Sequence, residues 1–367
     1  MKRKTTEDQR KELHYGRKRH QRELLRKSRF YQLDKPSPPI QSLFKGEIIS
    51  APEVISIYEF SSEETNFYTE TVRFSERLEK LMAKGPCVVD FRQTRRVSAA
   101  ALVIVCAALD SCERDGKWIS TVLWSEVSPS VNQALKRTRI ADKIKGKNFD
   151  YNFSSIKNLP VISSSGNEHM EDILDYIQKC VYENKMEPET EHIYGDAVSE
   201  TINNVGLHAY PDALASSKRW WLLCDVVGDQ LYLAIYDRGV GIPKTVLDKP
   251  WFLDSMEKVY PDQYGEMKRE FPELERSGMR IFVPRKLYDT QMIYLSMQGD
   301  VSGTRKDKHG QGSKSIKALV NETDDGKLWI FSNKGLYKFY RDEVAPELYR
   351  LPKKMPGTLV QWNIKLS

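Results

Sequence analysis

Three polar side chains in the second half of the chain have the spacing of one helical face. Glu200, Asn204 and His208 are each four residues apart, and apolar residues such as Val198 and Ile202 line another face of the same run. A ridge of carboxylate, carboxamide and imidazole groups suits a hydrated Mg²⁺ with phosphates, because hard oxygen ligands and water hold this cation. For His208 the alternative interpretation is a surface histidine with no ligand.

A second segment whose residues could bind a ligand follows an expected strand over residues 231–237. The strand ends in Asp237-Arg238-Gly239-Val240-Gly241. Two glycines at this spacing would let the backbone approach a flat ligand closely. The Asp237 carboxylate could accept a hydrogen bond from an amino group of that ligand.

A third segment places two glycines at the start of an apolar-patterned helix. Gly310 and Gly312 are separated by a single glutamine and are followed by Ser313 and Lys314. Backbone N–H groups at the start of a helix favour phosphate, and the lysine adds positive charge. The spacing differs from that of a P-loop, in which four residues separate the glycines.

In this order the three segments resemble the GHKL ATPase family, which includes histidine kinases, Hsp90, MutL, type II topoisomerases and anti-sigma serine kinases. The Gly357-Thr358 strand is typical of the family too, and residues 197–210 are most similar to anti-sigma serine kinases. The resemblance implies an α/β sandwich of the Bergerat type over residues 170–367, with ATP and Mg²⁺ as cofactors.

The resemblance also implies a role for each matching residue. Glu200 would orient or deprotonate water or a substrate hydroxyl, Asn204 would bind Mg²⁺, and Asp237 would read the adenine amino group. The remaining residues would shape the adenine pocket (Gly239, Gly241) or lie beside the phosphates (His208, Gly310, Gly312, Lys314).

The chain departs from the family pattern around the ATP lid, which is expected at about residues 295–312. The family commonly continues its glycine box as Gly-Leu-Gly-Leu, whereas this chain continues from Gly312 with Ser-Lys-Ser. This difference argues against rapid lid closure and rapid turnover. Residues 242–309 are too many for a simple loop and must contain helices of their own. A hairpin is expected over residues 327–339, with its turn at 332–335.

The first half of the chain alternates strands with helices, which predicts an α/β domain over residues 46–150. Helices are expected over 67–83, 99–112 and 129–144. Val88-Val89-Asp90-Phe91, a short loop and Val97-Ser98-Ala99-Ala100-Ala101-Leu102 resemble the mixed-sheet STAS domain of anti-anti-sigma factors. Both serine positions of that family's phosphorylated loop are alanine here, so the resemblance implies a docking or dimerisation module. Ser98 is either a neighbouring phosphoacceptor or the cap of the following helix.

Charge is concentrated at the N-terminus. The net charge of +6 combines about +8 from residues 1–30, which hold 12 Lys/Arg and four acids, with about −2 from the rest. Such an arm could bind nucleic acid, or pack on its own acidic body or a second subunit. Five cysteines without a CxxC pair predict buried thiols. The absence of a signal peptide and of a long apolar stretch predicts a cytoplasmic protein without membrane contact.

These features together predict a basic arm (1–45), a STAS-like domain (46–150), a linker (151–169) and a GHKL ATP-binding domain (170–367). The leading hypothesis is a bacterial ATP-dependent regulatory switch that engages a partner protein, with ATP hydrolysis or protein-kinase activity left open. The alternatives are a serine/threonine kinase of the anti-sigma type and a nucleic-acid-associated ATPase. A homodimer fits each of them. His169 is the nearest candidate for a histidine-kinase phosphoacceptor, but its surroundings lack that family's pattern, and a residue near a helix start is the alternative.

Overall fold

The computed structural model describes most of the chain from residue 46 onward, and Glu47–Ser367 group into one unit. The basic arm (1–45) and residues 299–310, which include Gly310 and most of the expected lid, lie outside the described residues. The predictions made for them therefore stay predictions. The described residues are 46–59, 66–112, 120–147, 153, 158–273, 275–298, 311–323, 325–341, 343 and 345–366.

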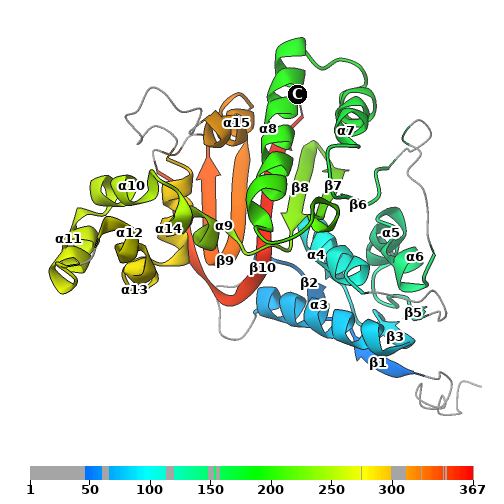
Figure 1. The fold of residues 1–367 in the computed structure, drawn as a ribbon. Helices are drawn as coiled ribbons and strands as arrows, with labels where there is room; N and C mark the ends of the chain where they lie inside the picture. The colour runs from blue at the N-terminus through cyan, green and yellow to red at the C-terminus, as the bar shows by residue number, and fades with distance from the viewer. Residues whose placement is uncertain are drawn as a thin grey trace, which may run out of the picture. The chain divides into compact units, whose positions relative to one another are not determined.

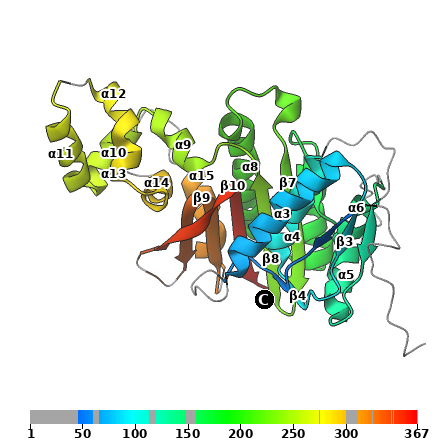
Figure 2. The same cartoon turned by 90° about the horizontal axis from the view of Figure 1, so that it is seen from below.

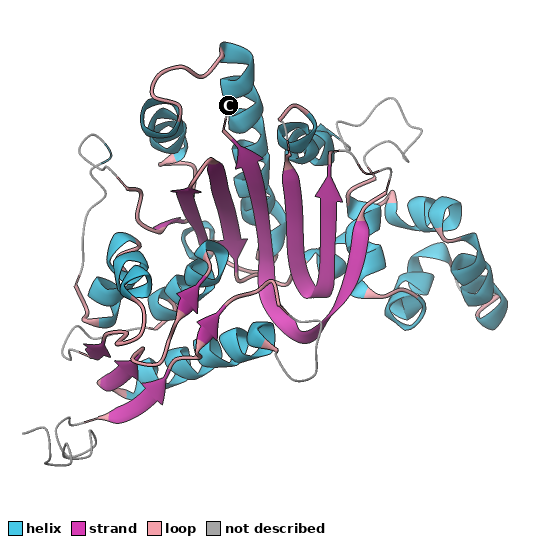
Figure 3. Cartoon of the chain, turned by 180° about the vertical axis from the view of Figure 1, so that it is seen from behind, coloured by secondary structure: helices cyan, strands magenta, loops and turns pink. Residues whose placement is uncertain are grey.

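A five-stranded antiparallel sheet forms the centre of the α/β fold (Figures 1 and 3). Side chains alternate between the two faces of each strand, and both faces are apolar here. On one strand Trp220 and Leu222 face one core while Trp221 and Leu223 face another. Helices must therefore cover the sheet on both sides. The strands, in sheet order, are β6 (Ile162–Ser164), β7 (Trp220–Val227), β8 (Gln230–Asp237), β10 (Glu347–Lys365) and β9 (Lys327–Tyr340).

One face of this sheet is covered by helices from the second half of the chain. The long helix α8 packs against α15 and against α7. Apolar residues of these helices join Trp220, Leu222 and Trp362 of the sheet in one core. The first helix of this layer is α7 (Met170–Tyr176), which a π-helical turn η2 (Ile177–Val181) continues. The other helices of this layer are α8 (Pro188–Asn204), its π-helical extension η3 (Val205–Ala209) and α15 (Gln311–Asn321).

The opposite face is covered by two helices from the first half of the chain (Figure 2). Helix α4 (Ala99–Asp110) packs on β7 and β8, and α3 (Phe67–Lys84) packs on β10. Every residue from Ala100 to Leu109 is buried, as a helix that is apolar on all sides requires. The predicted first and second domains therefore share one hydrophobic core.

Polar contacts reinforce this shared core. Asp110, at the end of α4, accepts a hydrogen bond of 2.9 Å from the Trp221 indole and one of 2.7 Å from Lys143. Arg137 forms an ion pair with Asp225 of β7. These contacts place charges at the edge of an apolar interface, where each has a partner.

The rest of the first half of the chain forms small parallel sheets. Among the described strands, both pairings of the three-stranded sheet are parallel, so the mixed character expected for this part is absent from them. The helix expected over 129–144 is interrupted because Arg139 adopts a left-handed conformation with φ of 61°. The strands are β1 (Glu47–Ser50), β3 (Cys87–Asp90) and β5 (Thr121–Leu123), with β2 (Val54–Ile55) paired to β4 (Arg96–Val97). The interrupted helices are α5 (Pro129–Arg137) and α6 (Ile140–Ile144).

The hairpin predicted over residues 327–339 is wrong. Strand β9 continues through the expected turn, and both of its halves pair with β10. The register shifts on both sides of the pair between Asn333 and Met355, because β10 carries extra residues and bulges there, and Asn333 itself has φ of 51°. Polar residues that usually make turns are buried here because the neighbouring loop gives them hydrogen-bond partners.

Residues 242–298 form a helical insertion with its own core, as their number predicted. Buried residues such as Phe252, Met256 and Met267 pack within it. No helix in the part of the chain that the structure describes is long and apolar enough to cross a membrane. The helices of the insertion are α9 (Ile242–Thr245), η5 (Val246–Asp248), α10 (Phe252–Val259), α11 (Pro261–Glu270), α12 (Arg276–Met279), η6 (Arg280–Phe282), α13 (Val283–Lys286) and α14 (Asp289–Ser296).

Candidate functional site

A cavity of about 410 Å³ lies between the central sheet, helix α8, the helical insertion and the start of α15. This volume is in the range of small-molecule sites. Its apolar side chains include Ile235, Ile330 and Val360, one from each of three neighbouring strands. Its polar side chains come from segments far apart in the sequence and include Glu200, Asn204, His208, Asp237, Lys249, Ser313 and Thr358.

The polar ridge predicted on α8 reaches the cavity. Asn204 donates a hydrogen bond of 3.1 Å from Nδ2 to Oε1 of Glu200, one helical turn away. The helix becomes π-helical at Val205, so the α-helical spacing that was predicted to align His208 with the other two is not kept. All three side chains still line the cavity, and both ring nitrogens of His208 lie 3.2 Å from Nζ of Lys249.

Asp237 is a buried carboxylate at the end of β8. Its side chain is 6 % exposed, and Oδ1 accepts a hydrogen bond of 2.7 Å from the Gly239 amide. Burial raises the pKa of Asp237 to about 7, while hydrogen bonds from the amides of Gly239 and Thr358 oppose this shift. The cavity therefore contains an acid that changes its protonation state near neutral pH.

The two glycines after Asp237 permit close packing of the protein on itself. A Cβ on Gly239 would lie 2.1 Å from the carbonyl oxygen of Ala209, and the next amide, that of Val240, donates to the same oxygen at 2.8 Å. Gly241 has φ of +87°, and a Cβ there would lie 2.9 Å from Oγ of Ser332. Gly241 lines the cavity, whereas Gly239 instead holds the loop against the end of the α8–η3 helix.

The start of α15 touches the polar ridge. A Cβ on Gly312 would lie 2.0 Å from Oε1 of Glu200, so a side chain at this position would displace the Glu200 carboxylate. Gly312 and Ser313 line the cavity, while Lys314 is exposed and is not among the residues that line it. The third predicted segment is therefore brought to the first through Gly312.

Sequence analysis missed the contribution of the helical insertion. Thr245, Lys249, Trp251 and Ser255 all line the cavity. No local pattern marks them, because their approach depends on how the insertion folds back towards α8. Its length was the one available signal.

Two further candidates lie outside this cavity. Ser98 occupies the position before α4, but its side chain makes no capping hydrogen bond, so the capping role expected for it is wrong. Its Oγ is buried and has no hydrogen-bond partner in the described part of the chain. His169 precedes α7 and lies 3.7 Å from the carboxylate of Asp172. Neither residue is brought to the polar ridge.

Comparison of the chain with models of protein families found no match, and neither did a search of curated proteins.

Proposed function

We propose that this protein binds Mg-ATP in the cavity as a GHKL-type ATPase and acts as an ATP-dependent regulatory switch that engages a partner protein. The observation that carries the proposal is the convergence of separate segments on one cavity. Glu200 and Asn204, the loop after Asp237, Gly312 and Thr358 lie around it although more than 150 residues separate the first from the last.

The apolar part of the cavity is suited to an adenine base. Ile235, Ile330 and Val360 provide a surface from three adjacent strands, on which a flat ring can pack. Asp237 lies at the end of the first of these strands. Its carboxylate can accept a hydrogen bond from an exocyclic amino group, and burial makes such a bond discriminating because a ligand without this donor leaves part of the buried acceptor capacity unused.

The polar ridge offers ligands for a metal ion and phosphates, in contrast to the apolar part of the cavity. Glu200, Asn204 and Ser313 offer oxygen atoms, and Mg²⁺ prefers such ligands. The described residues contain no cluster of three or more His, Cys, Asp or Glu that could hold a metal ion. This fits Mg²⁺ held by one or two protein groups together with phosphates and water, and Asn204 is the ligand we assign. The bound ion would neutralise phosphate charge.

Glu200 is the residue we assign to proton transfer. Its Oε1 is held by the Asn204 amide and closely covered by Gly312. A carboxylate positioned in this way can orient a water molecule or a substrate hydroxyl and accept its proton. The N-terminus of α15 is the positive end of that helix's dipole, and it would lie beside the phosphates.

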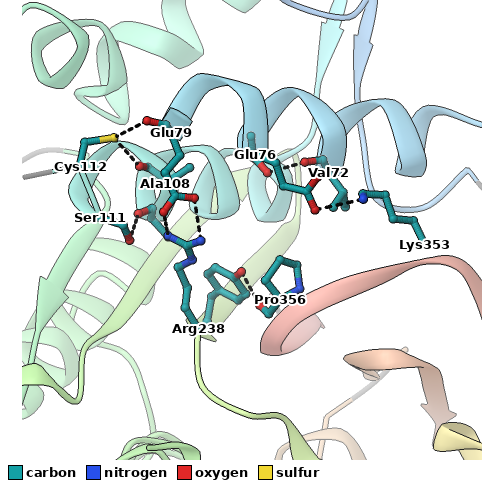
Figure 4. A network of polar contacts seen from close by, with 12 residues as sticks. Val72, Glu76, Glu79, Ala108, Ser111, Cys112, Arg238, Lys353 and Pro356 are labelled. Atoms are coloured by element: carbon teal, nitrogen blue, oxygen red, sulfur yellow. Dashed lines mark hydrogen bonds and ion pairs between the residues drawn. The ribbon is translucent and has the colours of Figure 1, made fainter. Parts of the chain in front are cut away.

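The proposal of a switch rests on the contact between α3 and the loop that follows β8 (residues 238–241), which we call the cavity loop (Figure 4). Arg238, the residue after Asp237, donates to both carboxylate oxygens of Glu79 at 2.9 and 2.8 Å. Lys353 of β10 forms a second ion pair with α3, to Glu76 at 3.1 Å. A ligand at Asp237 that prefers one arrangement of this loop would bias the docking of α3, and this differential affinity is what a switch requires.

The test follows the γ-phosphate of labelled Mg-ATP incubated with purified protein, with Asn204→Ala as the blank. Free phosphate that disappears in the variant supports hydrolysis, and intact bound ATP supports a sensor. Label on a co-purified protein would favour a serine/threonine kinase instead. Stimulation by DNA or RNA that is lost on deleting residues 1–35 would favour the nucleic-acid-associated ATPase. Absence of any nucleotide binding overturns the proposal.

A further inference from the structure

The helical insertion contributes a cation to the cavity. Lys249 lies between η5 and α10, lines the cavity, and approaches His208 on the opposite wall with its Nζ at 3.2 Å from both ring nitrogens. We propose that Lys249 binds the phosphate chain of the nucleotide and thereby ties the helical insertion to the bound ligand. This inference rests on the proposed function and assigns a ligand contact to a segment outside the three matching boxes.

Lys249 is a half-buried lysine without an ion-pair partner among the described residues. None of the ion pairs within the described ranges involves Lys249, and the nearest charged neighbour in sequence, Asp248, is exposed. Burial lowers the pKa of Lys249 below its usual range, with the Asp248 charge opposing the shift. A partly desolvated cation without a carboxylate partner gains most from an anionic ligand.

Hydrogen bonds of the Lys249 backbone hold this residue in place. Its amide donates to the carbonyl oxygen of Val246 at 3.0 Å. Its own carbonyl oxygen accepts from the Phe252 amide at 3.2 Å and from the Arg280 guanidinium at 3.2 Å. Three segments of the insertion therefore hold this one residue. A ligand bound by Lys249 is linked through these contacts to α10 and η6.

A cation contacting phosphate has a distinctive signature in a ligand series. A charge-assisted hydrogen bond increases ligand affinity roughly tenfold to hundredfold. The loss should therefore be large for ATP, smaller for AMP and absent for adenosine. A residue that only maintains the fold of the cavity would affect all adenine ligands equally.

The experiment measures binding of ATP, ADP, AMP, adenosine and inorganic tripolyphosphate by calorimetry at one Mg²⁺ concentration. The variant is Lys249→Met, which keeps the apolar stem, and Lys249→Arg is the rescue because it restores the charge. Lys244→Ala is the matched control, since this lysine is exposed in the same insertion and does not line the cavity. Far-UV circular dichroism of each variant checks that it is folded.

We expect Lys249→Met to weaken ATP binding at least tenfold and adenosine binding less than twofold, with recovery in Lys249→Arg and no change in Lys244→Ala. Equal weakening of all adenine ligands, or no weakening of ATP, overturns the inference while leaving the proposed function intact. If the wild type binds tripolyphosphate through Lys249 but no adenine ligand, Lys249 is a polyphosphate contact only, and both the nucleotide assignment and the proposed function fail. Binding of none of the five ligands refutes both.

Discussion

The buried acid Asp237 makes a prediction in which stability and ligand binding move in opposite directions. Asp237→Asn removes the charge while keeping the size of the side chain and an oxygen that can accept the Gly239 amide. We expect the variant to be more stable than the wild type above neutral pH. We also expect it to bind adenine nucleotides more weakly, because under the proposed function the carboxylate would accept a hydrogen bond from the ligand's amino group, and an amide does not reproduce that acceptor.

The size of the stability effect follows from the two pKa values. The pKa of Asp237 is about 7 in the folded protein and 3.8 for an ordinary aspartate. Between these values the folded state binds a proton that the unfolded state has lost, so stability falls as pH rises. The loss is about 1.4 kcal/mol per pH unit, or about 4 kcal/mol in total by pH 7. The asparagine variant lacks this decline.

The assay is urea denaturation of both proteins at several pH values from roughly 5 to 8, where the Asp237 contribution changes. The quantity to plot is the difference in unfolding free energy between variant and wild type, which we expect to grow with pH. Asp229→Asn is the control, since this carboxylate is exposed in the turn between β7 and β8. A difference that stays constant with pH would refute the reasoning, because it would mean that Asp237 is not protonated in the folded state.

Three further outcomes follow from the structure. Gly312→Ala should abolish γ-phosphate release with little change in adenosine affinity, because its Cβ would displace the Glu200 carboxylate; unchanged turnover would remove Glu200 from the chemistry. Glu79→Gln should lower the unfolding free energy by about 1–3 kcal/mol, because the Arg238 side chain is less than a third exposed and would lose its charged partner. A change below experimental error would mean that solvent replaces the pair. Mg-ATP at about 100 times its dissociation constant should raise the unfolding free energy by about 2.7 kcal/mol, and a chelator should reduce this gain; a shift insensitive to chelation would argue against a metal in the site.

Local pattern was sufficient for most of the helices and for the polar ridge. The helices expected over 67–83 and 99–112 form as α3 and α4, because their apolar spacing and flanking residues act within a few residues. The spacing of Glu200 and Asn204 predicted that they share one helical face, and in the structure they form a hydrogen bond there, since helical geometry brings residues four apart together. The glycines after β8 pack closely on Ala209 and Ser332 in the structure, whereas the approach to a flat ligand that was predicted for them stays a prediction.

Long-range packing decided what lies around those elements. No local signal indicated that α3 and α4 would cover the second face of the central sheet, because this depends on complementary apolar surfaces more than 100 residues apart in the chain. The Ser332–Gly335 stretch reads as a turn but continues as a strand, since pairing with β10 and hydrogen bonds to the Gly241 loop outweigh local turn preference.

The cavity as a whole is also a product of long-range packing. The residues that carry carboxylate, amide and glycine chemistry could be named before any fold was known, because residue type and helical spacing are local properties. The fold was needed to see that Gly312 touches Glu200, that Lys249 faces His208, and that Arg238 joins the loop after β8 to α3. These contacts join segments brought together by the sheet and by burial of its two faces, and such forces act between parts of the chain that no local pattern relates.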